Sequence, residues 1–372
     1  MSKKVYFFAP ISSIKQPKRF SKMVPHFLEN NFNIYYYGWE RKKGELTQLE
    51  WRDARVMQHS LLYGGGHVSK KVLFMYPLWM ILVFIKALFL EKKSIVFCLG
   101  WETAFPLVLA SIFKPLEIYF DDGDRFSMVK KFPTRLKRIV SYLEEWTYKR
   151  VVLHLIPGWS RYKNKNKNMV ILQNTPSNDD FIKSSQMNHN FKFEDKFVVY
   201  INGWVGKTRG APIFNKLAKK TYNSNIVFLI AGRVDCSEGL ELVKQSNVIY
   251  IGEVDSIKAL SLYKVSHVVL TYYDPSIEIN HFAESNKWGD CIYYATPFIV
   301  NEEVTTSQAF VEKKCAWSVA YHDVNNLYDI LVELSNNPSM LEEYSQNLIK
   351  MRDEYPLFDD QLKNIINSIV NR

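Results

Sequence analysis

Cysteine is scarce in this chain of 372 residues. The four cysteines, Cys98, Cys236, Cys291 and Cys315, lie far apart and form no CxxC pair, which excludes a disulfide-stapled scaffold and gives no zinc motif. The eight histidines form no HxxxH or HExxH pattern, and neither a Walker loop nor a GxGxxG fingerprint occurs. These absences fit a protein of the reducing cytoplasm.

Long apolar runs are also rare. The first residues, MSKKVYFFAPISS, contain an apolar run that is too short for a signal peptide and lacks a small-residue cleavage site, so they predict a buried strand. Residues 73–90 approach the ~20 residues that a membrane-spanning helix needs, but Pro77 and Lys86 interrupt them. We expect a core or interfacial helix there; insertion into a membrane surface stays open, and the lysine argues against a true span.

Acidic residues are few in the first half of the chain. Residues 1–180 hold 29 basic and 15 acidic side chains (+14), whereas residues 181–372 hold 19 and 23 (−4), which together give the net charge of +10. An excess of cations predicts an anionic partner. Because the second half is acidic, we favour a membrane surface or a phosphorylated small molecule over nucleic acid.

Short apolar strands alternate with helix-length segments, which predicts parallel sheets covered by helices. Strands are expected at residues 5–9, 34–38, 95–100, 118–121 and 151–156, and again at 197–202, 226–231, 248–251, 267–271 and 297–300. A polar stretch, residues 176–195, separates the two series and is the expected hinge. The sequence therefore predicts two doubly wound α/β domains, 1–180 and 181–354, and a terminal amphipathic helix, 355–372, that packs back on the first domain.

A glycine-rich loop with two cations follows the strand expected at 197–202. The sequence GWVGKTRG contains Gly203, Gly206 and Gly210 with Lys207 and Arg209 between them, and a helix is expected from residue 211. Glycines allow close backbone approach, a helix N-terminus offers free N–H groups, and the cations suit phosphate oxygens. The segment predicts a diphosphate cradle; a strand-to-helix turn with solvated cations is the alternative.

A second candidate segment begins at His281. Asn286, Lys287 and Asp290 precede the strand expected at 297–300, and the three-residue step places Lys287 and Asp290 on one helical face. A carboxylate could accept ribose hydroxyl groups while the lysine contacts phosphate. A capped helix with a surface ion pair would show the same pattern.

Together the two segments resemble the C-terminal domain of the retaining glycosyltransferase family 4, which has the GT-B fold of two Rossmann-like domains. The family's G-x-x-G-K-x-x-G loop corresponds to GWVGKTRG, and its later K-x-x-E helix corresponds to NKWGDCIYYATP; the segments FLIAGR, with Arg233, VIYIGEV and LSLYKVSHVVLTYYDPS lie between them in the family's order. The chain departs from the pattern at Asp290, where the family usually has Glu, at Ala295, where it usually has Gly, and at Phe282, where a first acid would fall.

The resemblance implies roles for these residues. Lys207 and Arg209 would stabilise the departing diphosphate, and the donor-binding set would be Gly203, Gly206, Gly210, Arg233, Asn286, Lys287 and Asp290. The donor would be a UDP- or GDP-sugar, transfer would proceed with retention, and no metal or cofactor would be required.

The first half offers acceptor-side candidates. Asp121, Asp122 and Asp124 end the strand expected at 118–121, Trp101 and Glu102 follow the strand at 95–100, and His281 lies near the second candidate segment. Each aspartate could instead cap a turn.

Basic and aromatic residues of the first half could also form a surface for anionic lipid headgroups. This predicted surface comprises Arg19, Lys22, Lys70, Lys71, Lys130, Lys131, Arg135, Lys137 and Arg138 with Phe20, Phe74, Trp79 and Phe132. A scattered solubilising surface is the alternative.

We therefore expect a cytoplasmic glycosyltransferase, peripheral on the inner face of the cell membrane. It would transfer a sugar to a glycan or polyprenyl-diphosphate-linked acceptor in surface polysaccharide biosynthesis. A nucleotide-sugar epimerase on the same fold and a non-catalytic basic protein that binds membrane or nucleic acid are the alternatives.

Overall fold

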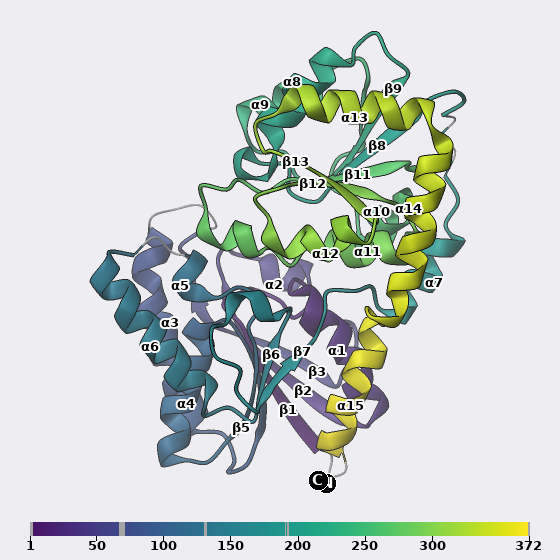
Figure 1. Cartoon of the computed structure of the whole chain (residues 1–372). Coiled ribbons are helices and arrows are strands. Elements are labelled where there is room, and N and C mark those ends of the chain that lie inside the picture. Colours follow the sequence, from purple (N-terminus) through teal and green to yellow (C-terminus); the bar gives the residue numbers. More distant parts are fainter. Residues whose placement is uncertain (1–2, 67–70, 130–131, 190, 192, 371–372) are drawn as a thin grey trace. The chain divides into compact units, whose positions relative to one another are not determined.

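The chain forms two compact units in the computed structural model, which describes residues 3–66, 71–129, 132–189, 191 and 193–370. One unit comprises Met1–Gln173 with Asp359–Arg372, and the other comprises Asn174–Phe358 (Figure 1). Lys70, Lys130 and Lys131 of the predicted headgroup surface lie outside the described residues.

The first unit is built on a seven-stranded parallel sheet in the order β3-β2-β1-β4-β5-β6-β7. Val5 of β1 lies opposite Ile34 of β2 on one side and Ile95 of β4 on the other. Strands buried on both faces explain the near-continuous apolar runs of the central strands. The strands are β1 (Lys3–Phe8), β2 (Phe32–Glu40), β3 (Val56–Tyr63), β4 (Ile95–Leu99), β5 (Glu117–Asp121), β6 (Leu153–Ile156) and β7 (Met169–Ile171).

Helices cover both faces of this sheet. Figure 1 shows α1 and α15 on one face and α3, α4 and α6 on the other. His26 of α1 contacts Asp359 of α15, with 2.6 Å between Nε2 and Oδ1, so the C-terminal helix belongs to the first unit. The helices are α1 (Lys18–Glu29), α2 (Glu45–Gln48), α3 (Lys71–Leu88), α4 (Trp101–Phe113), α5 (Phe126–Val129), α6 (Thr134–Tyr148), the 3-10 turn η1 (Trp159–Arg161) and α15 (Phe358–Val370).

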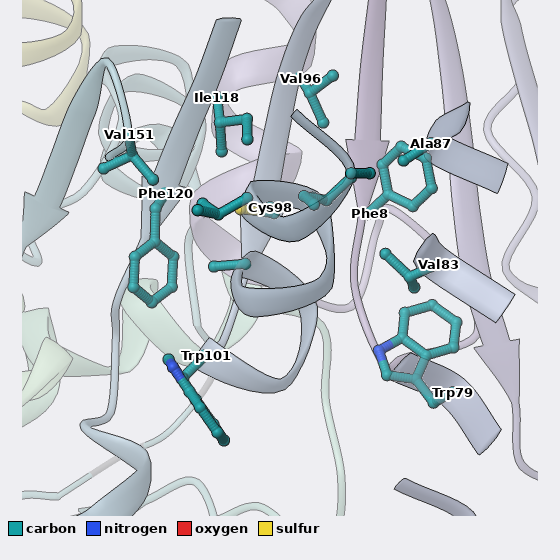
Figure 2. Close-up of a cluster of buried hydrophobic side chains, with 14 of the residues drawn as sticks. Phe8, Trp79, Val83, Ala87, Val96, Cys98, Trp101, Ile118, Phe120 and Val151 are labelled. Carbon is teal, nitrogen blue, oxygen red and sulfur yellow. The ribbon is translucent and has the colours of Figure 1, made fainter. Parts of the chain in front are cut away.

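One core of this unit lies between the sheet and helices α3 and α4. Figure 2 shows Phe8 of β1 and Cys98 of β4 facing Trp79 and Val83 of α3, with Trp101 of α4 nearby. All five side chains are at most 5% exposed. Because neighbouring residues of a strand point to opposite faces, Phe7 lies on the other side of the sheet, where its ring stacks on Phe97 at 5.2 Å.

The second unit contains a six-stranded parallel sheet in the order β10-β9-β8-β11-β12-β13. One hydrophobic core covers each face. Its strands are β8 (Phe197–Asn202), β9 (Ile226–Ala231), β10 (Val248–Tyr250), β11 (Val268–Thr271), β12 (Phe298–Asn301) and β13 (Ala316–Val319). Its helices are α7 (Asn178–Gln186), α8 (Ala211–Lys220), α9 (Ser237–Leu242), α10 (Ser256–Ser261), α11 (Asn286–Tyr294), α12 (Gln308–Glu312), α13 (Val324–Asn336) and α14 (Pro338–Lys350), with 3-10 turns η2 (Lys207–Arg209), η3 (Leu262–Val265), η4 (Glu278–Phe282), η5 (Thr305–Ser307) and η6 (Met351–Asp353).

The sequence pattern missed β3, β7 and β13, and each is an edge strand of its sheet. An edge strand is only partly covered, so it does not need the continuous apolar run that reveals a central strand. β3 reads VMQHSLLY and carries three consecutive polar residues, and β7 has only three residues.

The expected hinge is partly helical, and the long apolar run forms a helix as expected. The expected hinge at 176–195 contains helix α7, whose N-cap Ser177 accepts a hydrogen bond from the N–H of Asp180. The apolar run 73–90 falls largely on α3, and among the described residues no helix is both long and apolar enough to cross a membrane.

Candidate functional site

The glycine-rich loop leaves the carboxyl end of β8 and leads into α8. Gly203 has φ 84°, Lys207–Arg209 form the 3-10 turn η2, and Gly210 has φ 86° at the start of α8. A Cβ at Gly210 would lie 2.5 Å from the ring of Phe214 and 2.8 Å from Cβ of Tyr272. Both the backbone conformation and the packing therefore require glycine at position 210.

The expectation that α8 offers free N–H groups was wrong. The N–H of Ala211 donates to the carbonyl of Gly206 and that of Ile213 donates to the carbonyl of Gly210. Pro212, at the beginning of the helix, has no N–H. Any anion bound here would therefore depend mainly on the cationic side chains and the loop.

Arg209 and Lys287 come together at one aromatic ring, although 77 residues lie between them in the sequence. The Arg209 guanidinium carbon lies 4.7 Å from the centroid of the Tyr273 ring, and Nζ of Lys287 lies 5.9 Å from the same centroid. Arg209 also donates from Nη1 to Oδ1 of Asn280 at 2.8 Å. Tyr273 thus joins the two predicted donor-binding segments.

Tyr273 is itself held from several directions. Its hydroxyl donates to Oγ of Ser285 at 2.6 Å, and its backbone N–H donates to Oδ1 of Asn301 at 2.8 Å. Asn301 donates in turn to Glu303 at 2.9 Å. Burial would raise the pKa of Glu303, but hydrogen bonds from Asn301 and the N–H of Tyr321 hold it below its usual value. These hydrogen bonds therefore fix the backbone and the ring of Tyr273 at the carboxyl ends of β11 and β12.

Lys287, Arg209 and Lys207 form no close ion pair, although hydrogen bonds and, to a lesser degree, the charge of Lys207 lower the pKa of Glu238. Within the described part of the chain, no carboxylate lies within 4.0 Å of any of their side-chain nitrogens. Lys207 is exposed on η2, while Arg209 and Lys287 are half-buried. Arg209 and Lys287, which meet at Tyr273 without a close ion pair, favour binding of an anion there.

Asp290 faces the buried side of α11. Its Oδ2 accepts a hydrogen bond from the Tyr263 hydroxyl at 3.4 Å, and that hydroxyl accepts from Nδ2 of Asn202 at 3.1 Å. Burial, and then the Asp290 carboxylate, raise the pKa of Tyr263 well above its usual value, so its hydroxyl stays a donor. Asp290 is half-buried, and Asn286 is exposed at the N-terminus of α11.

Arg233 lies at the carboxyl end of β9 beside the glycine-rich loop. It pairs with Asp235, with 3.1 Å between Nη2 and Oδ2, and lies 5.7 Å from the ring centroid of Trp204. The Trp204 indole N–H donates to Oδ1 of Asp235 at 2.7 Å. Unlike Lys207 and Arg209, Arg233 is thus already neutralised by a neighbouring carboxylate.

His281 is fixed by backbone carbonyls. Its Nδ1 lies 2.9 Å from the carbonyl oxygen of Glu303 and its Nε2 lies 2.8 Å from that of Pro275. Both ring nitrogens are therefore occupied within the second unit.

In the first unit, Asp121 and Asp122 are completely buried at the end of β5. Asp121 pairs with Arg19 at 2.8 Å, and Asp122 accepts from the Tyr162 hydroxyl at 2.8 Å and lies 3.1 Å from Nε2 of His154. Burial raises the pKa of Asp121 despite Arg19, whereas hydrogen bonds outweigh burial and lower the pKa of Asp122. Both carboxylates are occupied by protein partners.

The other acceptor-side candidates differ in exposure. The side chain of Asp124 is 70% exposed and lies 3.1 Å from Nη1 of Arg161. Trp101 is 5% exposed, and its indole N–H donates to Thr147 at 3.1 Å, so this ring packs in the core. Glu102 is 9% exposed at the first turn of α4. Asp124 is thus the aspartate of this group with substantial contact with solvent.

Tyr273 and Asn280 were not among the residues selected from the sequence. Both lie in the segment TYYDPSIEIN, which begins at the last residue of β11. Polar residues at the carboxyl end of a parallel strand are a usable signal, but nothing in the sequence indicates which ring two distant cations will share.

Throughout residues 3–66, 71–129, 132–189, 191 and 193–370, no three His, Cys, Asp or Glu side chains are grouped to hold a metal ion.

Comparison with known proteins gives one curated relative and a shared architecture. No family model matches the sequence. The chain is 24% identical over 311 residues to a curated relative from Rickettsia felis, UDP-N-acetylglucosamine–N-acetylmuramyl-(pentapeptide) pyrophosphoryl-undecaprenol N-acetylglucosamine transferase, and the match covers 77% of this chain and 80% of that protein.

Solved structures show the same architecture. Sucrose-phosphate synthase from Thermosynechococcus elongatus matches with a TM-score of 0.67 at 11% identity over 98% of this chain and 97% of its own. A UDP-N-acetylglucosamine 2-epimerase matches with a TM-score of 0.58 at 12% identity over 93% of this chain and 91% of its own. These likenesses confirm the predicted fold of two Rossmann-like domains. The curated relative is a glycosyltransferase by name, and the architecture shared with sucrose-phosphate synthase is the GT-B fold; membership of family 4 stays a prediction.

Proposed function

We propose that this protein transfers a sugar from a UDP- or GDP-sugar to a glycan or lipid-linked acceptor, with retention, in surface polysaccharide biosynthesis. The second unit would bind the donor, and the first would bind the acceptor. The protein would work in the cytoplasm, at the inner face of the cell membrane.

The observation that carries this proposal is the meeting of Arg209 and Lys287 at Tyr273, with Lys207 in the adjoining loop. A nucleoside diphosphate supplies the negative charge that these cations lack. During transfer, the bond between the sugar and the diphosphate breaks and negative charge grows on the leaving oxygen. Cations already held in position stabilise that charge without reorganising, which is the main electrostatic requirement of the reaction.

The proposed donor-binding residues have different roles. Lys207 and Arg209 would contact the diphosphate, Asn286 and Lys287 would approach it from α11, and Asp290 would accept ribose hydroxyl groups. Gly203, Gly206 and Gly210 would allow close backbone approach. Arg233 would contribute only when it leaves Asp235. We assign no covalent nucleophile.

The acceptor part of the proposal is supported by the curated relative, whose name describes transfer to a pyrophosphoryl-undecaprenol acceptor. The first half of this chain has an excess of 14 cations, which suits an acceptor held by a diphosphate at a membrane. On the acceptor side, Asp124 and Glu102 are the carboxylates we would test first, because Asp121 and Asp122 are occupied by protein partners.

The direct test is a thermal-shift series with UDP, GDP, UMP and several UDP- and GDP-sugars. A ligand that binds only the folded state raises the apparent melting temperature with concentration. We expect a nucleoside diphosphate to stabilise the protein more than its monophosphate. No shift with any nucleotide would contradict the donor site.

An epimerase is the second candidate, because a UDP-N-acetylglucosamine 2-epimerase shares the fold. The two functions differ in their need for an acceptor. Incubation with UDP-N-acetylglucosamine alone, followed by NMR, would reveal a new sugar if the protein were an epimerase. We expect no epimer under these conditions.

A further inference from the structure

Helix α3 is apolar on two opposite sides, although only one of them faces the core. On the inner side, Trp79, Val83 and Ala87 recur every four residues and are fully buried against the sheet (Figure 2). On the outer side, Phe74 is 84% exposed and Ile81 55%, and Phe89, which directly follows the helix, is 78% exposed. An ordinary surface helix would present polar residues on that outer side.

The exposed apolar surface continues onto the neighbouring helices. α4 packs against both α3 and α6, and the three helices lie side by side in Figure 1. The Phe113 ring of α4 contacts Phe84 of α3 edge to face, with 6.3 Å between the centroids. Phe113 is 73% exposed, Ile139 of α6 57% and Tyr142 of α6 69%. We call Phe74, Ile81, Phe89, Phe113, Ile139 and Tyr142 the outer apolar face.

Exposed cations flank this face. Lys92 and Lys93 follow α3, and Lys149 and Arg150 follow α6. On α6, Arg135 and Arg138 are exposed immediately beside Ile139. One of the two acids of α6, Glu144, is completely buried and pairs with Arg125 at 3.1 Å, so it does not offset the surface charge.

We propose that the outer apolar face docks on an anionic lipid bilayer, with α3 lying in the plane of the interface. The apolar side chains would enter the boundary between headgroups and acyl chains, while the flanking cations contact lipid phosphates. A second copy of the chain fits less well, because a symmetric interface would bring two sets of cations together. This inference deepens the proposed lipid-linked acceptor but stands on exposure and charge alone.

The structure also revises the residues of the predicted headgroup surface. Phe20 and Trp79 are fully buried, and Arg19 is paired with Asp121, so the prediction was wrong for these three. Phe74, Arg135 and Arg138 are exposed as that prediction requires.

The test is cosedimentation of the full chain with vesicles. We expect it to bind vesicles of phosphatidylglycerol and phosphatidylethanolamine, to bind pure phosphatidylcholine much less, and to lose binding as salt increases. The variant Phe74→Ser/Ile81→Ser/Phe89→Ser and the variant Arg135→Glu/Arg138→Glu should each reduce the partition constant by at least about tenfold.

A matched control removes exposed apolar side chains from the second unit: Ile182→Ser/Tyr222→Ser/Leu240→Ser. These side chains are 47%, 59% and 51% exposed, and the variant should bind vesicles like the wild type. Circular dichroism checks that each variant is folded. Equal binding by all variants would overturn the proposal. So would absence of wild-type binding together with a dimer that the α3 variant dissociates, since the face would then be a contact between copies.

Assays of sugar transfer distinguish a failure of this inference from a failure of the proposed function. The α3 variant should keep transfer to a water-soluble acceptor analogue and lose transfer to an acceptor embedded in vesicles. If wild-type protein binds vesicles but transfers no sugar to either acceptor, the docking face stands and the proposed function fails.

Discussion

At the scale of single residues, the two cations of the glycine-rich loop have different environments. Arg209 is fixed by Asn280 and the Tyr273 ring, whereas Lys207 extends from η2 into solvent. Arg209 is therefore held in place, whereas in the proposed reaction the exposed Lys207 would follow the departing diphosphate. The proposed roles lead to separate predictions for the loop lysine and for the shared ring.

Replacing Lys207 by alanine should reduce turnover by ~10² or more at saturating donor, because one electrostatic contact to the leaving group is lost. Steady-state kinetics with the donor in excess measures this. Lys219→Ala is the control, since Lys219 is an exposed lysine of α8 that pairs with Glu241 at 3.3 Å. Near-wild-type turnover of Lys207→Ala would remove Lys207 from the mechanism.

Replacing Tyr273 by leucine should weaken nucleoside diphosphate binding by about tenfold, because Arg209 and Lys287 lose the ring that positions them, and each cation–π contact contributes about 0.5–2 kcal/mol. Tyr273→Phe keeps the ring and loses only the hydrogen bond to Ser285, so it should bind nearly normally. Isothermal titration calorimetry compares the two. If both variants bound equally well, the ring would have no positioning role.

At the scale of the element, helix α11 ends in a backbone conformation that suits glycine better than the residue present. Ala295, its C-cap, has φ 51° and ψ 36°. The left-handed conformation costs an L-residue about 1–2 kcal/mol. This position corresponds to the glycine of the family pattern. Both the resemblance and the left-handed backbone therefore favour glycine here, although the residue present is alanine.

Ala295→Gly should therefore stabilise the protein by about 0.5–1 kcal/mol, because relief of the left-handed alanine exceeds the added flexibility of the unfolded chain. Urea unfolding followed by circular dichroism measures the change. Ala259→Gly, within α10, is the opposite control and should destabilise by up to about 1 kcal/mol. Loss of stability in Ala295→Gly would contradict the conformational argument.

At the scale of the whole molecule, helix α15 returns from the end of the chain to the first unit. Leu362, Ile365, Ile366 and Ile369 are at most 5% exposed, as the predicted amphipathic face requires. The contact between His26 and Asp359 joins α15 to α1. The hydrogen bond to Asp359 raises the pKa of His26, assisted by the charges of Asp359 and Glu29.

This pair makes stability depend on pH. A histidine whose pKa is higher in the folded state stabilises fully below its unfolded pKa of about 6.5, and that contribution disappears as pH rises through the folded pKa. His26→Gln should therefore cost up to about 1 kcal/mol near pH 6 and much less near pH 9. Unfolding free energies of both proteins across this range test it; a difference independent of pH would show that the histidine acts by packing alone.

The sequence determined the central strands and the glycine-rich loop because each has a pattern that can be recognised locally. Buried strands such as β8 and β9 have continuous apolar runs, and the glycine-rich loop has a spacing that a short backbone segment must satisfy locally. The alternation of strands and helices was therefore enough to predict two parallel-sheet units, whereas the GT-B fold was implied by the family resemblance of the two motif segments.

The tertiary structure decided what depends on neighbours distant in the sequence. The edge strands β3, β7 and β13 form by pairing, Tyr273 becomes the meeting point of Arg209 and Lys287, and Asp121 and Asp122 become buried partners of Arg19, Tyr162 and His154. The residue type alone does not determine whether a carboxylate is paired with another side chain or whether a phenylalanine is exposed. Those properties come from packing, which brings separate segments together and leaves the outer side of α3 uncovered.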